Sequence, residues 1–263
     1  MQKESYRLSP NPLVQYLNKP AQEFTKKDLM TFVEHNQVEM INFHYVAQDG
    51  RLKTLNFVIN NVEHLDQILS SGERVDGSSL FSHIDPAASD LYVVPRYRTA
   101  FINPFSEIST LSLLCSFFTK DGKPLDSAPD EILRKAGRTL VEKTGFEFHC
   151  MGELEYYVIS EEDPMFPATD QKGYHESHPF NKMAELRKEA MYVIAQCGGE
   201  IKYGHSEVGN FIHEGLNYEQ NEIEFQPVHL EEAADQLIIA KWVLRNLAHD
   251  YGVTVTFSPK ITV

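Results

Sequence analysis

The sequence predicts an α+β protein with two domains. At 263 residues the chain exceeds the roughly 150 residues that are common for one domain, so two domains are favoured. In the second half, segments with strand and helix periodicity alternate irregularly, which favours α+β over a doubly wound sheet. The composition, with 42% hydrophobic and 24% charged residues, is too apolar for a disordered chain. We expect an arm and helix at 1–37, a strand-rich domain at 38–123 and a second domain at 124–263.

The first 24 residues contain prolines around a short apolar patch, Leu13, Val14 and Leu17. The patch indicates an arm that docks, and two interpretations have equal weight. The arm contacts another subunit, or it packs on its own subunit.

Three patterns predict the elements between residues 25 and 118. Thr25 is a candidate N-cap for an amphipathic helix over 25–36. Apolar residues alternate with polar ones on both sides of Asp49-Gly50, a dipeptide typical of hairpin turns. A long loop at 76–105, interrupted by an extended stretch at 91–94, precedes a strand at 111–118. Loops of this length are commonly functional.

The second domain begins with a helix signalled by Pro129 and Asp130 and ended by Gly145. Five residues of this helix form a stripe that we expect to be buried: Ile132, Leu133, Ala136, Leu140 and Val141. Strands are then expected at 146–159 and 253–257, and helices at 180–197 and 231–250.

The net charge and the number of cysteines argue against several classes of protein. With 24 basic and 38 acidic residues the formal charge is −14, so binding to nucleic acid or to an anionic membrane is not expected. Cys115, Cys150 and Cys197 lack CxxC spacing and are read as buried thiols in a reducing compartment. Neither a signal peptide nor a membrane span is evident, so we expect a cytoplasmic protein.

The segment from Met151 to Ile159 carries candidate metal ligands. Strand periodicity places Glu153 and Glu155 on one face and apolar side chains on the other. Two strand steps separate these carboxylates by roughly 7 Å. At an effective dielectric constant near 20 their repulsion is about 2 kcal/mol, which divalent cations would offset. The alternative is that both glutamates lie on a solvated strand face.

Two later segments favour the metal interpretation. Glu207 follows a strand-like stretch, and Glu222 and Glu224 repeat the same i, i+2 spacing. Oxygen ligands with little sulfur or imidazole favour Mg²⁺ or Mn²⁺ over zinc. A zinc site at His175, Glu176 and His178 is a weaker alternative, because these residues lack the i, i+4 histidine pair of a helical zinc site. The sequence has no Walker loop and no Gly-x-Gly-x-x-Gly motif.

These segments, in this order, resemble the glutamine synthetase family. The matching segments are V-D-G-S-S-L at 75–80, S-D at 89–90, P-F at 104–105, G-E-L-E-Y-Y at 152–157, H-S-E-V at 205–208, Y-E-Q-N-E-I at 218–223 and V-T-F-S-P-K at 255–260. The resemblance implies an amino-terminal β-grasp domain, followed by part of a catalytic domain built on a curved antiparallel sheet. It also implies ATP-dependent ligation of ammonia to the side chain of glutamate through γ-glutamyl phosphate, with Mg²⁺ or Mn²⁺, in a homo-oligomer of stacked rings.

The resemblance also assigns roles to the ligands of the cations. Glu155, Glu207 and Glu222 would hold the cation that helps to bind glutamate. Glu153 would hold a second cation, which bridges the phosphates of ATP.

Further roles concern the substrates. Asp76 would be catalytic by binding and deprotonating ammonium, and Ser78 and His205 would contact substrate. In the family the loop that carries Asp76 completes the site of a neighbouring subunit, so a lone subunit is expected to be inactive.

Departures from the family pattern predict an atypical branch. Ser206 replaces the second histidine of H-H-E, and residues 211–218 lengthen the interval between Glu207 and Glu222. Pro227 stands where an aromatic residue is expected, and Ile261 replaces a proline. The glycine-rich, histidine and arginine elements that follow in the family are not found, so we expect a fragment or a truncated gene product in which the second cation site is at most half present. Alternative functions are a γ-glutamyl ligase that uses an amine, and a non-catalytic scaffold.

Overall fold

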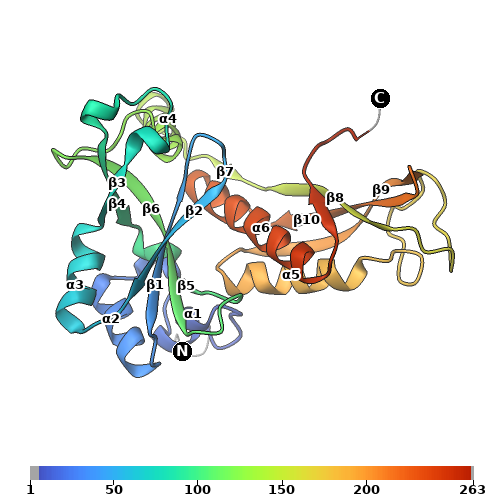
Figure 1. The fold of residues 1–263 in the computed structure, drawn as a ribbon, viewed down its shortest axis with the longest axis horizontal. Helices are drawn as coiled ribbons and strands as arrows, with labels where there is room; N and C mark the ends of the chain where they lie inside the picture. Colours follow the sequence, from blue (N-terminus) through green and yellow to red (C-terminus); the bar gives the residue numbers. More distant parts are fainter. Residues whose placement is uncertain (1–5, 262–263) are drawn as a thin grey trace. The chain divides into compact units, whose positions relative to one another are not determined.

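The computed structural model describes residues 6–261 and consists of two compact units. One unit comprises Met1–Phe148 with Gln196–Gly198, and the other comprises His149–Ala195 with Gly199–Val263. The architecture is α+β, as predicted (Figure 1). Within the described residues, no helix combines the length and the apolar character needed to cross a membrane. The predicted boundaries after residues 37 and 123 do not coincide with the ends of these units and stay predictions.

The first unit is built on a mixed sheet with strand order β2-β1-β6-β4-β3, and β5 pairs with β6. β1 and β6 are parallel, whereas the other pairs are antiparallel. The strands are β1 (Met40–Val46), β2 (Leu52–Val58), β3 (Glu73–Asp76), β4 (Asp90–Pro95), β5 (Phe101–Ile102) and β6 (Thr110–Thr119). The helices are α1 (Pro12–Leu17), α2 (Lys26–His35), α3 (Val62–Ser71) and α4 (Pro129–Thr144).

The predicted hairpin is confirmed by β1 and β2, which place Phe43 opposite Leu55. Gly50 in the turn has φ of 69°, a left-handed conformation that glycine adopts without strain. The helix predicted from Thr25 is confirmed as well. Its capping box pairs the Thr25 hydroxyl with the Asp28 N–H and the Asp28 carboxylate with the Thr25 N–H.

The amino-terminal arm packs on its own unit. Leu13 and Val14 of α1 are buried within the hydrophobic core of the first unit. The Asn11 side chain caps α1 by accepting hydrogen bonds from the N–H groups of both residues. The described part of the arm therefore fits the second interpretation, and residues 1–5 lie outside the described residues.

Helix α4 ends at Gly145 as predicted, but the prediction of its buried stripe is wrong. Ile132 is 55% exposed and Val141 is 42% exposed. The side chain that α4 buries is Glu131, which forms ion pairs with Arg134 and Arg138. Helical periodicity identifies the side chains that share a face but not whether anything packs against that face.

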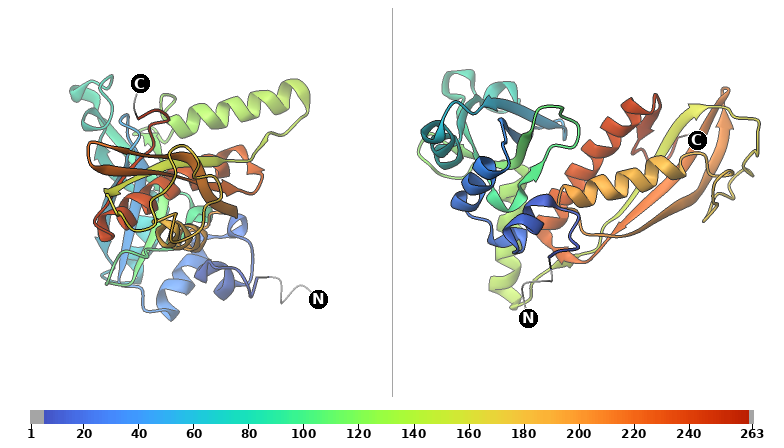
Figure 2. Two further views of the ribbon diagram at one scale, coloured as in Figure 1. Left: turned by 90° about the vertical axis from the view of Figure 1, so that its right-hand side faces the viewer. Right: turned by 90° about the horizontal axis from the view of Figure 1, so that it is seen from below.

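The second unit holds an antiparallel sheet with strand order β12-β8-β10-β9. Its strands are β8 (Glu153–Glu161), β9 (Ile201–His213), β10 (Leu216–Phe225) and β12 (Thr254–Thr256). A short pair, β7 (His149–Cys150) and β11 (Val228–His229), and two helices, α5 (Ala184–Gln196) and α6 (Leu230–Asp250), complete it. The helices lie along one side of the sheet (Figure 2).

Alternation along β8 separates the two faces of this sheet as predicted. Leu154, Tyr156 and Val158 are buried, and Ile223 of β10 lies on the same face as Leu154 because the two residues are directly paired. The predicted strand over 146–159 is wrong at its start, because β7 and β8 are separate strands. The two predicted helices are confirmed, with α5 beginning a few residues later than expected.

The cysteine prediction holds for two of the three residues. Cys115 and Cys197 are buried, and burial raises the pKa of each thiol. Cys150 is partly exposed, so the prediction of a buried thiol is wrong there, because Cys150 lies on the short β7 strand.

Candidate metal centre

The carboxylates lie on the face of the second sheet opposite to its buried apolar residues. Directly paired residues of antiparallel strands point to the same face, so strand pairing defines two rows of side chains. The first row consists of Glu155 on β8, Glu222 on β10 and His205 on β9. The second row consists of Glu153 on β8, Glu224 on β10 and Tyr203 on β9.

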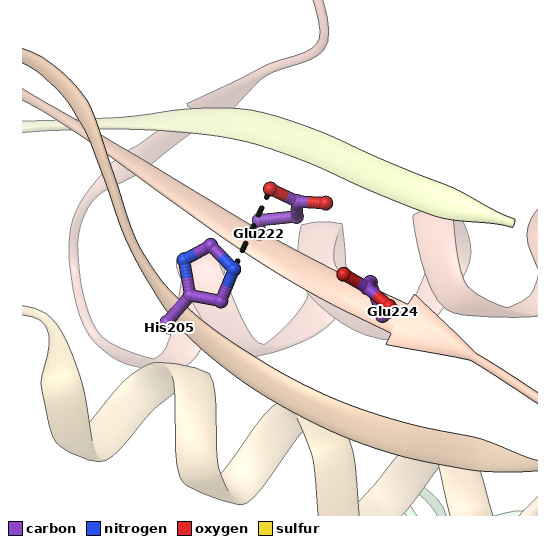
Figure 3. A group of neighbouring side chains, drawn as sticks. All are labelled: His205, Glu222 and Glu224. Atoms are coloured by element: carbon purple, nitrogen blue, oxygen red, sulfur yellow. Dashed lines mark ion pairs between the residues drawn. The ribbon is translucent and has the colours of Figure 1, made fainter. Parts of the chain in front are cut away.

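His205 lies between two carboxylates of this face. Its Nε2 is 3.7 Å from Glu222 Oε2, and its Nδ1 is 3.7 Å from Glu207 Oε1. Figure 3 shows His205 and Glu222 pointing toward one another from neighbouring strands, with Glu224 farther along β10. Potential ligand atoms of His205, Glu222 and Glu224 lie within 4.8 Å of one another. Together with Glu153 and Glu207 these residues line a hollow of about 620 Å³.

A β-bulge in the pairing of β9 and β10 contains Glu207. The pairing shifts so that residues 207–209 stand opposite Gln220. The Gln220 side chain accepts a hydrogen bond from the Gly209 N–H at 2.9 Å and donates one to Glu155 Oε2 at 2.6 Å. A Cβ on Gly209 would lie 2.2 Å from the Tyr157 hydroxyl oxygen and 2.5 Å from Gln220 Oε1, so a larger residue here would displace these side chains. Gln220 thereby fixes one oxygen of Glu155.

Glu222 has the most perturbed carboxylate of this face. Burial raises the pKa of Glu222 to about 7, and repulsion from Glu153, Glu207 and Glu155 acts in the same direction. His205 lowers this pKa. The first row therefore holds negative charge that the surrounding side chains do not neutralise, which is a condition suited to a bound cation.

Aromatic side chains form one wall of the hollow. Tyr174 stacks on His175 with ring centroids 4.0 Å apart, and the ring of His175 lies 4.5 Å from that of His205. His175 and Glu176 thus line the same hollow, whereas His178 is not one of its lining residues. The zinc alternative at these three residues stays untested.

The chain segment before α5, which contains Tyr174 and His175, is hydrogen-bonded to a glutamate on the opposite face of the sheet. Glu219 of β10 is buried, and burial raises its pKa. Its carboxylate accepts hydrogen bonds from the Asn181 side chain at 2.6 Å and from the N–H groups of Lys182 and Met183 at 2.7 and 2.8 Å. Local sequence patterns do not reveal this anchor, because Glu219 bonds to residues that lie 36 to 38 positions away in the chain.

Two predicted site residues, Asp76 and Ser78, lie in the first unit. Asp76 begins the short 3₁₀ helix Gly77–Ser79. Hydrogen bonds from Ser78, Ser79 and Ser89 hold the pKa of Asp76 well below its usual range. Ser78 contributes both its N–H, at 3.0 Å, and its hydroxyl, at 2.7 Å. Asp76 is therefore an exposed carboxylate that stays ionised.

Two family models match consecutive parts of the chain. Residues 37–120 match the glutamine synthetase β-grasp domain, and residues 126–263 match the glutamine synthetase catalytic domain. The chain belongs to the glutamine synthetase family. The resemblance predicted from the sequence is thus confirmed, together with the β-grasp domain that it implied.

Curated relatives with different names are similar to this chain. A glutamine synthetase of Methanococcus maripaludis is 26% identical over 88% of this chain and 52% of its own length. A 3-hydroxylaminophenol mutase of Cupriavidus pinatubonensis is 28% identical over 89% of this chain and 54% of its own length. The glutamine synthetase of Plasmodium falciparum has the same fold, with a TM-score of 0.77, 18% identity and coverage of 91% of this chain and 51% of that chain. This chain spans about half the length of the curated relatives that it matches.

Proposed function

We propose that this glutamine synthetase family chain carries a divalent-cation site for the ATP-dependent ligation of ammonia to glutamate. The reaction gives glutamine through γ-glutamyl phosphate. The observation that supports the proposal best is that Glu207 and Glu222 flank His205 on one sheet face, with Glu155 paired directly with Glu222. The raised pKa of Glu222 adds to it, because a buried carboxylate among carboxylates favours a bound cation.

The donor set fits Mg²⁺ or Mn²⁺. These cations prefer carboxylate oxygens, and the first row with Glu207 offers three carboxylates and one imidazole. We assign Glu155, Glu207 and Glu222 as the residues that would hold the cation. When bound, the cation would help to bind glutamate and to activate the nucleophile.

The remaining residues would position and bind substrates. The hydrogen bond from Gln220 orients Glu155 toward the site. His205, held between Glu207 and Glu222, would contact glutamate. Asp76 would attract ammonium through its constant negative charge. A carboxylate with so low a pKa is a weak proton acceptor, so its serine hydrogen bonds would have to loosen before it removed a proton from ammonium.

We further propose that the site works in a homo-oligomer, in which the Asp76 loop of one subunit serves a neighbour. Because the chain spans about half the length of its curated relatives, we expect the 263 residues alone to release no phosphate from ATP with glutamate, ammonium and Mg²⁺. Measurable turnover by this chain alone would contradict the expectation.

The ligase activity is tested by joining the chain to the carboxy-terminal half of the M. maripaludis relative. ATP-dependent glutamine formation from ammonium, abolished by Glu155→Ala, is the expected result. Methylamine serves as the competing acceptor, and exclusive use of methylamine would replace ammonia by an amine in the proposal. Turnover that survives Glu155→Ala would remove the cation site from the reaction.

A further inference from the structure

The second row of the carboxylate face differs from the first because a β-bulge lies beside it. Glu224 pairs with Tyr203, but the next residue, Phe225, pairs with Ile201, so Lys202 is an extra residue on β9. A bulge interrupts the alternation of a strand and can re-aim a side chain. Regular alternation would point Lys202 away from the face that carries Tyr203. The bulge brings both side chains to Glu224.

Both oxygens of Glu224 are engaged by this bulge. Lys202 Nζ lies 2.7 Å from Glu224 Oε2, and the Tyr203 hydroxyl donates a hydrogen bond to Glu224 Oε1. The Lys202 ammonium also lies 4.7 Å from the centroid of the Tyr203 ring and 3.7 Å from Met151 Sδ. Glu224 is buried and the Lys202 side chain is 34% exposed. The ammonium is thus held by a carboxylate, an aromatic face and a thioether.

The position of Lys202 bears on how many cations the face can hold. A carboxylate oxygen of Glu224 lies within 4.8 Å of potential ligand atoms of His205 and Glu222, and Glu153 stands directly opposite Glu224. In the family, the position of Glu153 is expected to hold a second divalent cation. A divalent cation in the second row of this chain would have to displace an ammonium that the chain itself tethers there.

We propose that Lys202 is a built-in cation that occupies Glu224 and restricts this face to one divalent cation. The inference rests on the proposed cation site in the first row. The second row then carries the single positive charge of the Lys202 ammonium, which is part of the chain, in place of a divalent cation that can dissociate. Glu224 is then a masked ligand, which becomes available when the ammonium is removed.

The number of bound Mn²⁺ ions tests the proposal. Equilibrium dialysis followed by metal analysis gives the stoichiometry for the wild-type chain and for Lys202→Met, which keeps an unbranched side chain one atom shorter and without its charge. We expect one Mn²⁺ in the wild type and two in Lys202→Met. Lys202→Arg, which keeps the charge, and the double variant K202M/E224Q, which lacks the unmasked ligand, should each bind one. Lys188→Met removes an exposed lysine that pairs with Glu185 on α5, and it should also bind one.

Each pattern of results has a definite meaning. One ion in both the wild type and Lys202→Met overturns the role of Lys202 and leaves the first-row site intact. Two ions in the wild type also overturn the inference. A second ion in Lys188→Met shows that any lost positive charge suffices, which contradicts a specific mask. The absence of bound Mn²⁺ in every variant overturns the first-row site and the inference with it.

Discussion

Asp76 and Glu222 are both carboxylates to which the family resemblance assigns a site role, yet their surroundings move their pKa values in opposite directions. Asp76 is exposed on a 3₁₀ turn, where serine hydrogen bonds stabilise its charge and lower its pKa. Glu222 lies on a central strand, where burial and three neighbouring glutamates raise its pKa to about 7. The serine donors of the loop thus stabilise the charge of Asp76. The sheet does not stabilise the charge of Glu222 in this way, so a bound cation would balance it. A metal centre is therefore expected at Glu222 and not at Asp76.

The largest effect should come from removing the charge of each carboxylate in turn. Loss of a group that only orients a metal ligand lowers metal affinity by about 10- to 100-fold. Glu222 is proposed as a ligand itself, so Glu222→Gln should lower Mn²⁺ affinity by at least about 100-fold. Asp76→Asn makes the same chemical change in the loop and should leave Mn²⁺ affinity unchanged. Isothermal titration with Mn²⁺ measures both. Equal losses in the two variants would mean that general negative charge, and not the first row, binds the ion.

Acidification should weaken Mn²⁺ binding because a proton competes for Glu222. Below the pKa of about 7 this carboxyl is increasingly protonated. From pH 7.5 to pH 5.5 the affinity should fall by about 30-fold through this group. Asp76→Asn should show the same profile. A Mn²⁺ affinity that stays constant over this range would show that Glu222 is not a ligand.

A smaller loss is expected when the orientation of Glu155 is disturbed. Gln220→Leu removes the hydrogen bond to Glu155 Oε2 and should lower Mn²⁺ affinity by about 10-fold. Gln226→Leu, at an exposed position just after β10, is the matched control and should change little. An unchanged affinity in Gln220→Leu would mean that Glu155 needs no orienting partner or does not bind the ion.

The smallest effect concerns the stability of the metal-free protein. Because the folded state raises the pKa of Glu222, the folded chain binds the proton more tightly than the unfolded chain. That contribution is present at pH 4 and is lost as the pH rises through about 7. At pH 8 with a chelator, Glu222→Gln should therefore be more stable than the wild type by about 1 kcal/mol. Thermal melts at pH 5 and pH 8 measure this difference, and a Tm of the variant below that of the wild type at pH 8 would contradict the expected sign.

Local patterns in the sequence predicted the elements that depend on neighbouring residues. The turn at Asp49-Gly50, the cap at Thr25 and the two faces of β8 each follow from residues a few positions apart. The alternation along β8 also placed Glu153 and Glu155 on the face opposite to the apolar residues. The meeting of Glu155 with Glu222 depends on which strands pair, and family resemblance supplied that relation where periodicity could not.

The misses have physical causes of three kinds. Lys202 was overlooked because a bulge breaks the alternation on which strand arguments depend. The stripe of α4 containing Ile132 was expected to be buried, but amphipathic spacing does not specify a partner for the apolar face. Glu222 and Glu224 repeat the i, i+2 spacing of Glu153 and Glu155. This spacing does not reveal that Glu224 lies near His205, which depends on the pairing of β9 and β10.

The most direct test of the metal centre is an anomalous difference map from crystals of this chain soaked in Mn²⁺. We expect one peak within coordinating distance of Glu155, Glu207 and Glu222. A peak at Asp76 with none at these three glutamates, or a map without a peak at the first row under saturating Mn²⁺, would contradict this expectation.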